Sequence, residues 1–253
     1  MKLPHLLTLA GIAASGSAIA GDSTYAAPAP VPPVIQDSND SLGFSVALGY
    51  DSSYIFRGAD FGDNLVWGDL SYANDFGSPV EFSVGTWYAA TNGSDGDEFD
   101  ELDVYGGIAA SAGPLDFGLG AIFYYFPDTD DNTFEVYGSV GTEFAGVGLE
   151  LYVGHDFELN DGGTYVALSA GYSIPLGDTL SLDFSSGISW GDDYNVPGGD
   201  GFNNIDLRLA LPIALTDSAT LEPYVAGSIA IDSLEDSGQD DHVYGGVSIS
   251  VSF

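Results

Sequence analysis

The sequence contains no cysteine and almost no basic residues. Lys plus Arg number 3 against 38 Asp plus Glu, which gives a formal net charge of −35 at pH 7. A chain without cysteine forms no disulfide framework and carries out no thiol chemistry. A chain without a basic surface cannot neutralise phosphates, so we expect no nucleic-acid partner.

Long apolar runs are also missing. No internal run reaches the roughly 18 residues that a transmembrane helix needs. An acidic chain with few apolar residues would be disordered, but here 45% of the residues are hydrophobic and Tyr and Phe number 15 each. A length of 253 residues suits one large all-β domain.

The amino-terminal segment has the features of a secretory signal. Lys2 provides a positive charge, residues 6–14 form a short apolar core, and Ala18-Ile19-Ala20 is an A-x-A cleavage site. A buried core helix is the alternative interpretation. We expect a signal peptide at 1–20 with cleavage after Ala20, or after Ala27 as the second choice.

Residues 21–41 contain Pro28, Pro30, Pro32 and Pro33, and we expect a disordered, extended periplasmic leader. The alternative is a segment that enters the barrel interior as a partial plug.

The final segment, 242–253, alternates strictly between apolar and small or polar residues, which is the side-chain period of a strand. An open apolar edge strand would template aggregation, and a closed barrel removes that edge by pairing the last strand with the first. The segment ends on Phe253, and we expect the barrel assembly machinery to be a partner through this strand.

The same alternation recurs along the chain from residue 42. We expect strands at about 42–56, 65–74, 80–90, 100–110, 115–126, 133–144, 147–158, 164–174, 180–190, 204–213, 221–232 and 242–253. Each is about long enough to cross a bilayer when tilted. The connections after even-numbered strands are short and those after odd-numbered strands are mostly longer and acidic, which is the asymmetry of outer-membrane barrels.

The two faces of these strands indicate which solvent each one meets. The apolar face is large and aliphatic or aromatic, whereas the other face is Gly, Ser, Ala and carboxylates, which cannot form a packed core. A soluble sandwich or lipocalin-like barrel, the competing fold, would show the reverse. We therefore predict an all-β fold, a closed antiparallel up-and-down transmembrane barrel of 12 strands at 42–253.

Aromatic residues gather near the strand ends, as interfacial girdles do. The expected outward-facing set is Tyr54, Phe56, Tyr88, Phe123, Tyr125, Phe134, Phe144, Tyr172 and Trp190.

The inward charged residues predict a narrow, water-filled channel for small hydrophilic solutes. Rings of Asp and Glu favour cations, although these carboxylates could also simply hydrate the interior. The predicted pore-lining set is Asp51, Arg57, Glu81, Glu101, Asp103, Glu135, Glu143, Glu150, Asp156, Asp183, Asp206, Arg208 and Glu222.

The two arginines of the chain, Arg57 and Arg208, both fall on the inward face, and we expect each to form bidentate carboxylate pairs. Arg57 is expected near Glu101, Asp103 or Asp60. Either the pair fixes strand order or a loop, or Arg57 forms a constriction.

Other functions are weighed against the channel. A lipid hydrolase would use Ser and His on the lipid face, and His155 and His242 are candidates, but no Ser or acid partner can be placed beside either one. We therefore expect no enzyme and no cofactor. A structural or surface-adhesion barrel is the further alternative.

Calcium is possible at Asp128-Thr-Asp130-Asp-Asn132 and Asp95-Gly-Asp97-Glu98, which offer oxygen ligands but lack the spacing of an EF-hand. Solvated loops, or loops that bridge to lipopolysaccharide through divalent ions, are the alternatives.

Four short motifs carry a resemblance to a known family. Asp51-Ser-Ser-Tyr-Ile-Phe-Arg-Gly58, Glu101-Leu-Asp-Val-Tyr-Gly-Gly107, Tyr124-Tyr-Phe-Pro127 and Phe134-Glu-Val-Tyr-Gly138 occur in order. Together they resemble the TorF-like porin family over roughly 42–230, although Ser-Ser stands where that family commonly has Ser-Asp and the loops are more acidic. The resemblance implies a barrel in the Gram-negative outer membrane, with lipid and lipopolysaccharide as partners and a channel role.

Overall fold

The computed structural model describes residues 42–91, 99–158, 162–194, 196 and 199–253. The expected signal peptide at 1–20, the Pro-rich leader at 21–41 and the acidic run Asp95–Glu98 lie outside these described residues.

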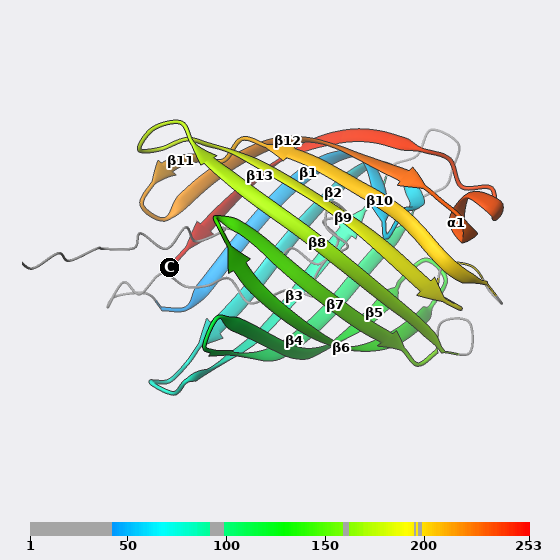
Figure 1. The fold of residues 1–253 in the computed structure, drawn as a ribbon, viewed down its shortest axis with the longest axis horizontal. Coiled ribbons are helices and arrows are strands. Elements are labelled where there is room, and N and C mark those ends of the chain that lie inside the picture. Colours follow the sequence, from blue (N-terminus) through cyan, green and yellow to red (C-terminus); the bar gives the residue numbers. More distant parts are fainter. Residues whose placement is uncertain (1–41, 92–98, 159–161, 195, 197–198) are drawn as a thin grey trace, which may run out of the picture.

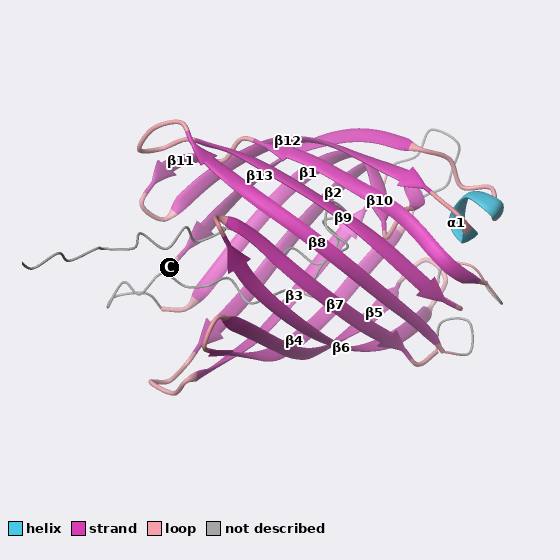
Figure 2. Cartoon of the chain, viewed as in Figure 1, coloured by secondary structure: helices cyan, strands magenta, loops and turns pink. Residues whose placement is uncertain are grey.

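Strands make up nearly all of the described chain (Figures 1 and 2). They are β1 (Phe44–Phe56), β2 (Ala59–Asn74), β3 (Val80–Ala90), β4 (Asp100–Ala112), β5 (Leu115–Phe126), β6 (Asp131–Phe144), β7 (Val147–Asp156), β8 (Gly163–Pro175), β9 (Ser181–Asp192), β10 (Asp200–Ala210), β11 (Ile213–Thr216), β12 (Ala219–Ala230) and β13 (His242–Ser252). A four-residue helix, α1 (Ser233–Asp236), precedes β13. No helix within the described ranges is long and apolar enough to cross a membrane.

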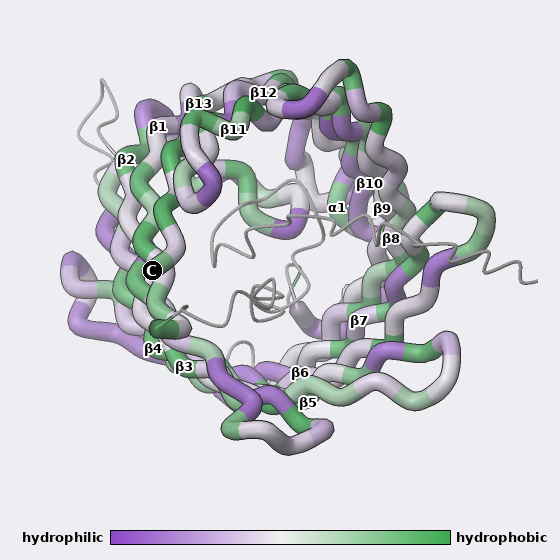
Figure 3. Tube along the Cα trace, turned by 90° about the vertical axis from the view of Figure 1, so that its left-hand side faces the viewer, coloured by the Kyte–Doolittle hydropathy of each residue, from purple (hydrophilic) through white to green (hydrophobic). Residues whose placement is uncertain are grey.

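The strands pair with their sequence neighbours in antiparallel register, and the ring closes between β1 and β13. Seven residue pairs join these two strands, from Ser45 opposite Ser252 to Asp51 opposite Gly246. Figure 3, turned by 90° from Figure 1, shows the strands arranged as this ring. The predicted closed antiparallel barrel is confirmed.

β10 and β11 form a single pass of the barrel, interrupted at Leu211-Pro212. Both segments pair with β12, and Leu211 N donates to Pro223 O between them. Pro212 has no N–H to donate to a ladder, so regular pairing stops there. The thirteen strand segments therefore make the twelve passes expected from the sequence.

Large apolar side chains cover the outside of the barrel. Leu48 is 58% exposed and Val66 59% exposed, and the same holds for outward positions of nearly every strand. The residues between them, such as Ala47 and Trp67, point inward and are buried. This is the arrangement of a barrel whose outer surface faces lipid.

The two ends of the barrel differ. We call the loop end the one that carries the connections after β1, β3, β5, β7, β9 and β12, including α1. The turn end carries the connections after β2, β4, β6, β8 and β11, together with the start of β1 and the end of β13. In Figure 1 the turn end is on the left and α1 marks the loop end on the right.

One expectation for the first strand is wrong. Tyr54 and Phe56 were expected on the outward face, but Tyr54 is buried in the interior and Phe56 packs against the interior cluster. The register of β1 against β2 shifts between Ser53 and Ile55. Such an irregularity re-aims the side chains that follow it, and here it turns them into the barrel.

Candidate functional site: the barrel interior

The β1–β2 hairpin bends into the barrel at the loop end. Arg57 and Gly58 form its two-residue turn, both with positive φ (51° and 83°), which matches the twist of antiparallel strands. In the ring, β1 and β2 are flanked by β13 and β3. Yet the tip of the hairpin contacts β6, β7 and β10, which belong to the opposite wall. We call residues 54–61 the inturned hairpin.

The turn of this hairpin is fixed against β10 and α1. Asn203 Nδ2 donates to the carbonyl oxygen of Arg57 over 2.6 Å. A Cβ at Gly58 would lie 2.6 Å from Leu234 Cδ2 and 2.9 Å from Asn204 Cγ, so a larger residue would force these side chains to move. Glycine is favoured at position 58 for two reasons: its φ is positive, and the side chains of Leu234 and Asn204 approach it closely.

Arg57 forms a bidentate ion pair with Glu135 of β6. Its Nη1 lies 2.6 Å from Oε2 and its Nη2 lies 2.9 Å from Oε1. The side chains of Arg57 and Glu135 are 1% and 0% exposed. Charge-assisted forks of this kind are strong and directional, and a buried pair is tolerated only with such geometry and further hydrogen bonds.

Tyrosines from the wall complete the surroundings of this pair. Tyr152 OH donates to Glu135, and Tyr194 OH donates to Glu135 Oε2 over 3.0 Å. Arg57 Cζ lies 4.4 Å from the ring centroid of Tyr165, 4.7 Å from that of Tyr194 and 5.4 Å from that of Tyr152. These distances are those of cation–π contacts.

Tyr194 follows β9 and is buried at the loop end. Burial raises the pKa of Tyr194 well above its ordinary value. Its hydroxyl is therefore protonated near neutral pH and can act as a donor to the carboxylate.

An aromatic cluster occupies the rest of the loop end. Tyr54 packs against Trp87, Phe61 and Phe99, with ring centroids 5.5 to 6.1 Å apart. The hydroxyl of Tyr54 donates to Glu101 Oε2 over 2.6 Å. Side chains from strands β1 to β8 meet in this one buried cluster. Over the described residues, the loop end is thus a packed core and not part of the narrow, water-filled channel predicted from the sequence.

Near the middle of the barrel, inward carboxylates accept hydrogen bonds from aromatic donors. Asp51 accepts from Trp67 Nε1 over 2.8 Å and from Tyr224 OH over 2.6 Å. Asp69 accepts from Tyr105 OH over 2.6 Å. Each bond joins different strands, so these polar contacts connect the barrel wall from inside.

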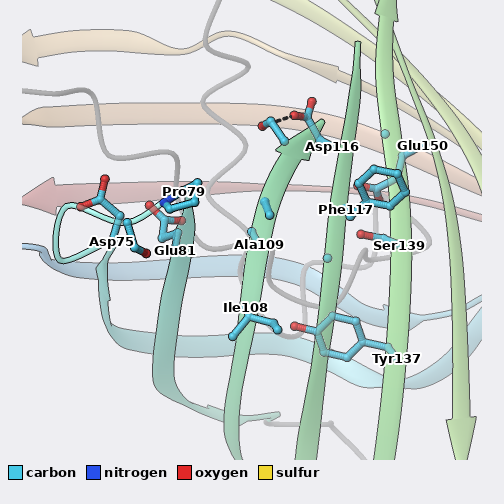
Figure 4. A pocket seen from close by; sticks show the side chains of 15 residues that line it. Asp75, Pro79, Glu81, Ile108, Ala109, Asp116, Phe117, Tyr137, Ser139 and Glu150 are labelled. Carbon is cyan, nitrogen blue, oxygen red and sulfur yellow. Dashed lines mark hydrogen bonds between the residues drawn. The ribbon is translucent and has the colours of Figure 1, made fainter. Parts of the chain in front are cut away.

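The turn end contains a cavity of about 270 Å³. Figure 4 shows Asp75, Glu81, Tyr137 and Glu150 among its lining residues, with Asp116 hydrogen-bonded to Ser111 over 2.6 Å. This part of the interior is hollow and acidic, in contrast to the loop end.

The second arginine lies on β10 among partly accessible residues. Arg208 Nη2 is 2.7 Å from Glu222 Oε1, and the side chains are 11% and 19% exposed. Arg208 Cζ lies 4.3 Å from the ring centroid of Tyr224. It therefore has the same kind of partners as Arg57 but in a wetter setting.

The structure divides the predicted pore-lining residues into three groups. Buried are Asp51, Arg57, Glu101, Asp103, Glu135, Asp156 and Asp206. Partly accessible are Glu81, Glu150, Asp183, Arg208 and Glu222, and Glu143 is exposed. Arg57 pairs with Glu135, which was not among the residues expected near it, Glu101, Asp103 and Asp60. The sequence did not reveal Tyr165, Tyr194 and Asn203 as residues of this site. The one feature of the sequence that pointed to a tight hairpin here was Arg57-Gly58.

His155 is exposed, hydrogen-bonds Thr164 through Nδ1 over 3.0 Å and packs edge-on against Phe157. His242 Nδ1 lies 3.8 Å from Asp60 Oδ2.

The acidic run 128–132 uses its carboxylates within the fold, since Asp128 accepts from Asp100 N and Asp130 accepts from Tyr125 OH. Across the described part of the chain, no group of three or more His, Cys, Asp or Glu is arranged to hold a metal ion.

Solved structures of outer-membrane channels share this fold. A COG4313 outer membrane channel from Pseudomonas putida F1 is 12% identical, with a TM-score of 0.55 over 86% of this chain and 100% of that chain. The KdgM porin is 12% identical, with a TM-score of 0.53 over 83% and 99%. The NanC porin is 11% identical, with a TM-score of 0.51 over 83% and 98%.

No curated protein sequence matches the chain. A protein-family model does match, and it covers residues 36–217, well over half of the sequence. The chain therefore belongs to the family described as bacterial protein of unknown function (Gcw_chp).

Proposed function

We propose that the protein is an outer-membrane channel for passive diffusion of small hydrophilic solutes, with a preference for cations. In the conformation described above, the inturned hairpin closes its loop end. The observation that carries the proposal is the distribution of side chains: the outer surface of the barrel is apolar, and its interior contains carboxylates, tyrosines and small residues. A polar interior is of use to a membrane barrel when solutes pass through it.

Charge supports the preference for cations. Asp75, Glu81, Asp116 and Glu150 line the cavity at the turn end, and none of the described residues that line it is an arginine or lysine. Carboxylates in a narrow passage attract cations and repel anions. The KdgM porin has been described in complex with oligogalacturonate, which is a polyanion; the acidic interior here would repel such a ligand.

The location follows from the same proposal. After removal of the signal peptide at 1–20, the barrel would be inserted in the outer membrane, in contact with lipid and lipopolysaccharide, by the barrel assembly machinery acting on β13. The ordered motifs that resemble those of the TorF-like porins support this assignment.

The test is conductance in planar lipid bilayers. We expect the wild-type barrel to conduct weakly. A variant in which residues 55–60 are replaced by Asn-Gly, a tight-turn sequence, should conduct several-fold more. In a KCl gradient its reversal potential should show selectivity for K⁺. Anion selectivity would contradict the cation preference.

A non-transport structural or adhesive barrel is the second candidate, and the packed loop end favours it. The same variant separates the two functions. If it folds, as shown by its heat-modifiable migration on gels, and still passes no current, the barrel is not a channel.

A further inference from the structure

Arg57 is surrounded by a carboxylate and by aromatic rings. A carboxylate grips the guanidinium through two parallel hydrogen bonds of 2.6 and 2.9 Å. Three tyrosine rings lie within 5.4 Å of Arg57 Cζ. Proteins bind organic cations with bidentate carboxylates and with cages of aromatic rings.

The walls of this site belong to the barrel and not to the hairpin. Glu135 is on β6, Tyr152 on β7, Tyr165 on β8, and Tyr194 follows β9. We call these four residues the cation cage. Only Arg57 and the flanking Phe56, 4.9 Å from Arg57 Cζ, are contributed by the hairpin.

The cage residues also hold one another in place. The hydroxyls of Tyr152 and Tyr194 both donate to Glu135. The ring of Tyr165 packs against the rings of Tyr152 and Tyr194, with centroids 6.4 and 5.5 Å apart. None of these contacts involves the hairpin, so we expect the cage to keep its shape when Arg57 is removed.

We propose that the cation cage is a recognition site for guanidino solutes, which Arg57 occupies as a ligand tethered to the wall of the same barrel. This inference rests on the proposed channel function. It names the class of solute that the channel would recognise at the loop end of the barrel. A solute that enters the cage takes the place of the Arg57 side chain, and the hairpin is then no longer fixed to β6.

The geometry favours a guanidinium group over other cations. The fork to Glu135 uses two donors in one plane, which a guanidinium provides and a quaternary ammonium lacks. A primary ammonium has donors but no flat face to lie against the tyrosine rings. Anions are excluded, because Glu135 is buried and charged.

Because Arg57 is attached to the barrel and occupies the cation cage, the binding test needs a variant without its side chain. Intramolecular ligands reach effective concentrations in the millimolar range, so free solutes compete poorly with Arg57 in the wild type. The experiment therefore uses Arg57→Ala in the full-length barrel in detergent micelles, with methylguanidinium chloride as the probe and calorimetric titration as the readout. Tetramethylammonium chloride is the cation control.

We expect Arg57→Ala to bind methylguanidinium at least tenfold more tightly than the wild type does, and more tightly than it binds tetramethylammonium. Adding Glu135→Gln to Arg57→Ala should reduce the affinity for methylguanidinium at least tenfold. If folded Arg57→Ala binds both cations equally, or if Glu135→Gln changes nothing, the inference is wrong.

A second variant covers the case in which the shortened side chain lets the hairpin sink into the empty cage. The replacement of residues 55–60 by Asn-Gly removes the occupant altogether and leaves the four cage residues in place. If this variant folds and also fails to bind methylguanidinium, the cage is not a recognition site.

Binding and conductance are measured separately, so the two proposals can fail separately. Binding of methylguanidinium without any ionic current would support the recognition site and contradict the channel function. Ionic current without guanidinium binding would leave the channel in place and overturn the cage.

Discussion

The two ends of the barrel interior are built from the same alternating strands but are filled in different ways. At the loop end, the inturned hairpin brings Tyr54 and Arg57 against aromatic residues and Glu135, and Tyr54, Arg57 and Glu135 are all buried. At the turn end, Glu81, Glu150 and their neighbours surround a cavity of about 270 Å³. Strand patterning therefore determines which side chains point inward, whereas one hairpin determines whether they enclose a space.

The largest difference between the two ends is expected when one charged residue is removed from each. Glu135→Ala leaves the guanidinium of Arg57 buried without its carboxylate, and such losses cost about 3–5 kcal/mol. Glu222→Ala, at the more accessible Arg208 pair, should cost less than about 1 kcal/mol. Urea unfolding of the barrel in lipid vesicles measures both.

The double variant Arg57→Ala/Glu135→Ala is the control for this prediction. It should recover much of the stability that Glu135→Ala loses, because no unpaired charge stays buried. Equal losses in the single and double variants would mean that the buried, unpaired guanidinium is not the source of the loss.

Glycine substitutions compare the hairpin turn with a turn-end connection. Gly58→Ala would place a Cβ 2.6 Å from Leu234, in addition to the strain of φ 83°, and we expect a loss of about 2–3 kcal/mol. Gly113→Ala has a similar φ of 66° but nothing within 4 Å, and should lose only about 1 kcal/mol. If thermal unfolding gives the same loss for both, the hairpin tip does not lie against α1.

A hydroxyl deletion tests the buried polar contacts of the loop end. Tyr54→Phe removes the donor to Glu101, so the buried carboxylate loses a hydrogen bond, and we expect a loss of about 1–3 kcal/mol. Tyr172→Phe, whose ring is exposed on the outside of the barrel, is the matched control and should be nearly neutral. Urea midpoints of the two variants provide the comparison.

The smallest effect on stability is expected in the cavity. Glu81→Gln combined with Glu150→Gln removes two of its carboxylates, and should change the free energy of unfolding by less than about 0.5 kcal/mol. The same change should reduce the K⁺ over Cl⁻ preference of the hairpin-replacement variant, as measured by its reversal potential in a KCl gradient. An unchanged reversal potential would place the selectivity elsewhere.

The sequence predicts most of the fold and less of the site. Strict alternation, as in β13, determines strands, faces and closure, because a strand with one apolar face has only one way to sit in lipid. The inward direction of Glu135 and Asp51 follows from the same periodicity. The pairing of Arg57 with Glu135 does not, since it depends on a shift of register between Ser53 and Ile55. Local patterns do not reveal how far a hairpin bends into a barrel, and Tyr194 lies in a connection with no period at all.

The junction of β1 and β13 joins residues as far apart as Ser45 and Ser252, whose hydroxyls lie 3.1 Å from each other. Neighbouring hairpins such as β2–β3 close over far fewer residues, from Asn74 to Phe82. Each doubling of the enclosed length adds about 0.6 kcal/mol of chain entropy to the first contact. Zipping of this junction should therefore be the slow, final event of assembly, and a chain stalled before it would present two unpaired strands to any neighbour with a matching edge.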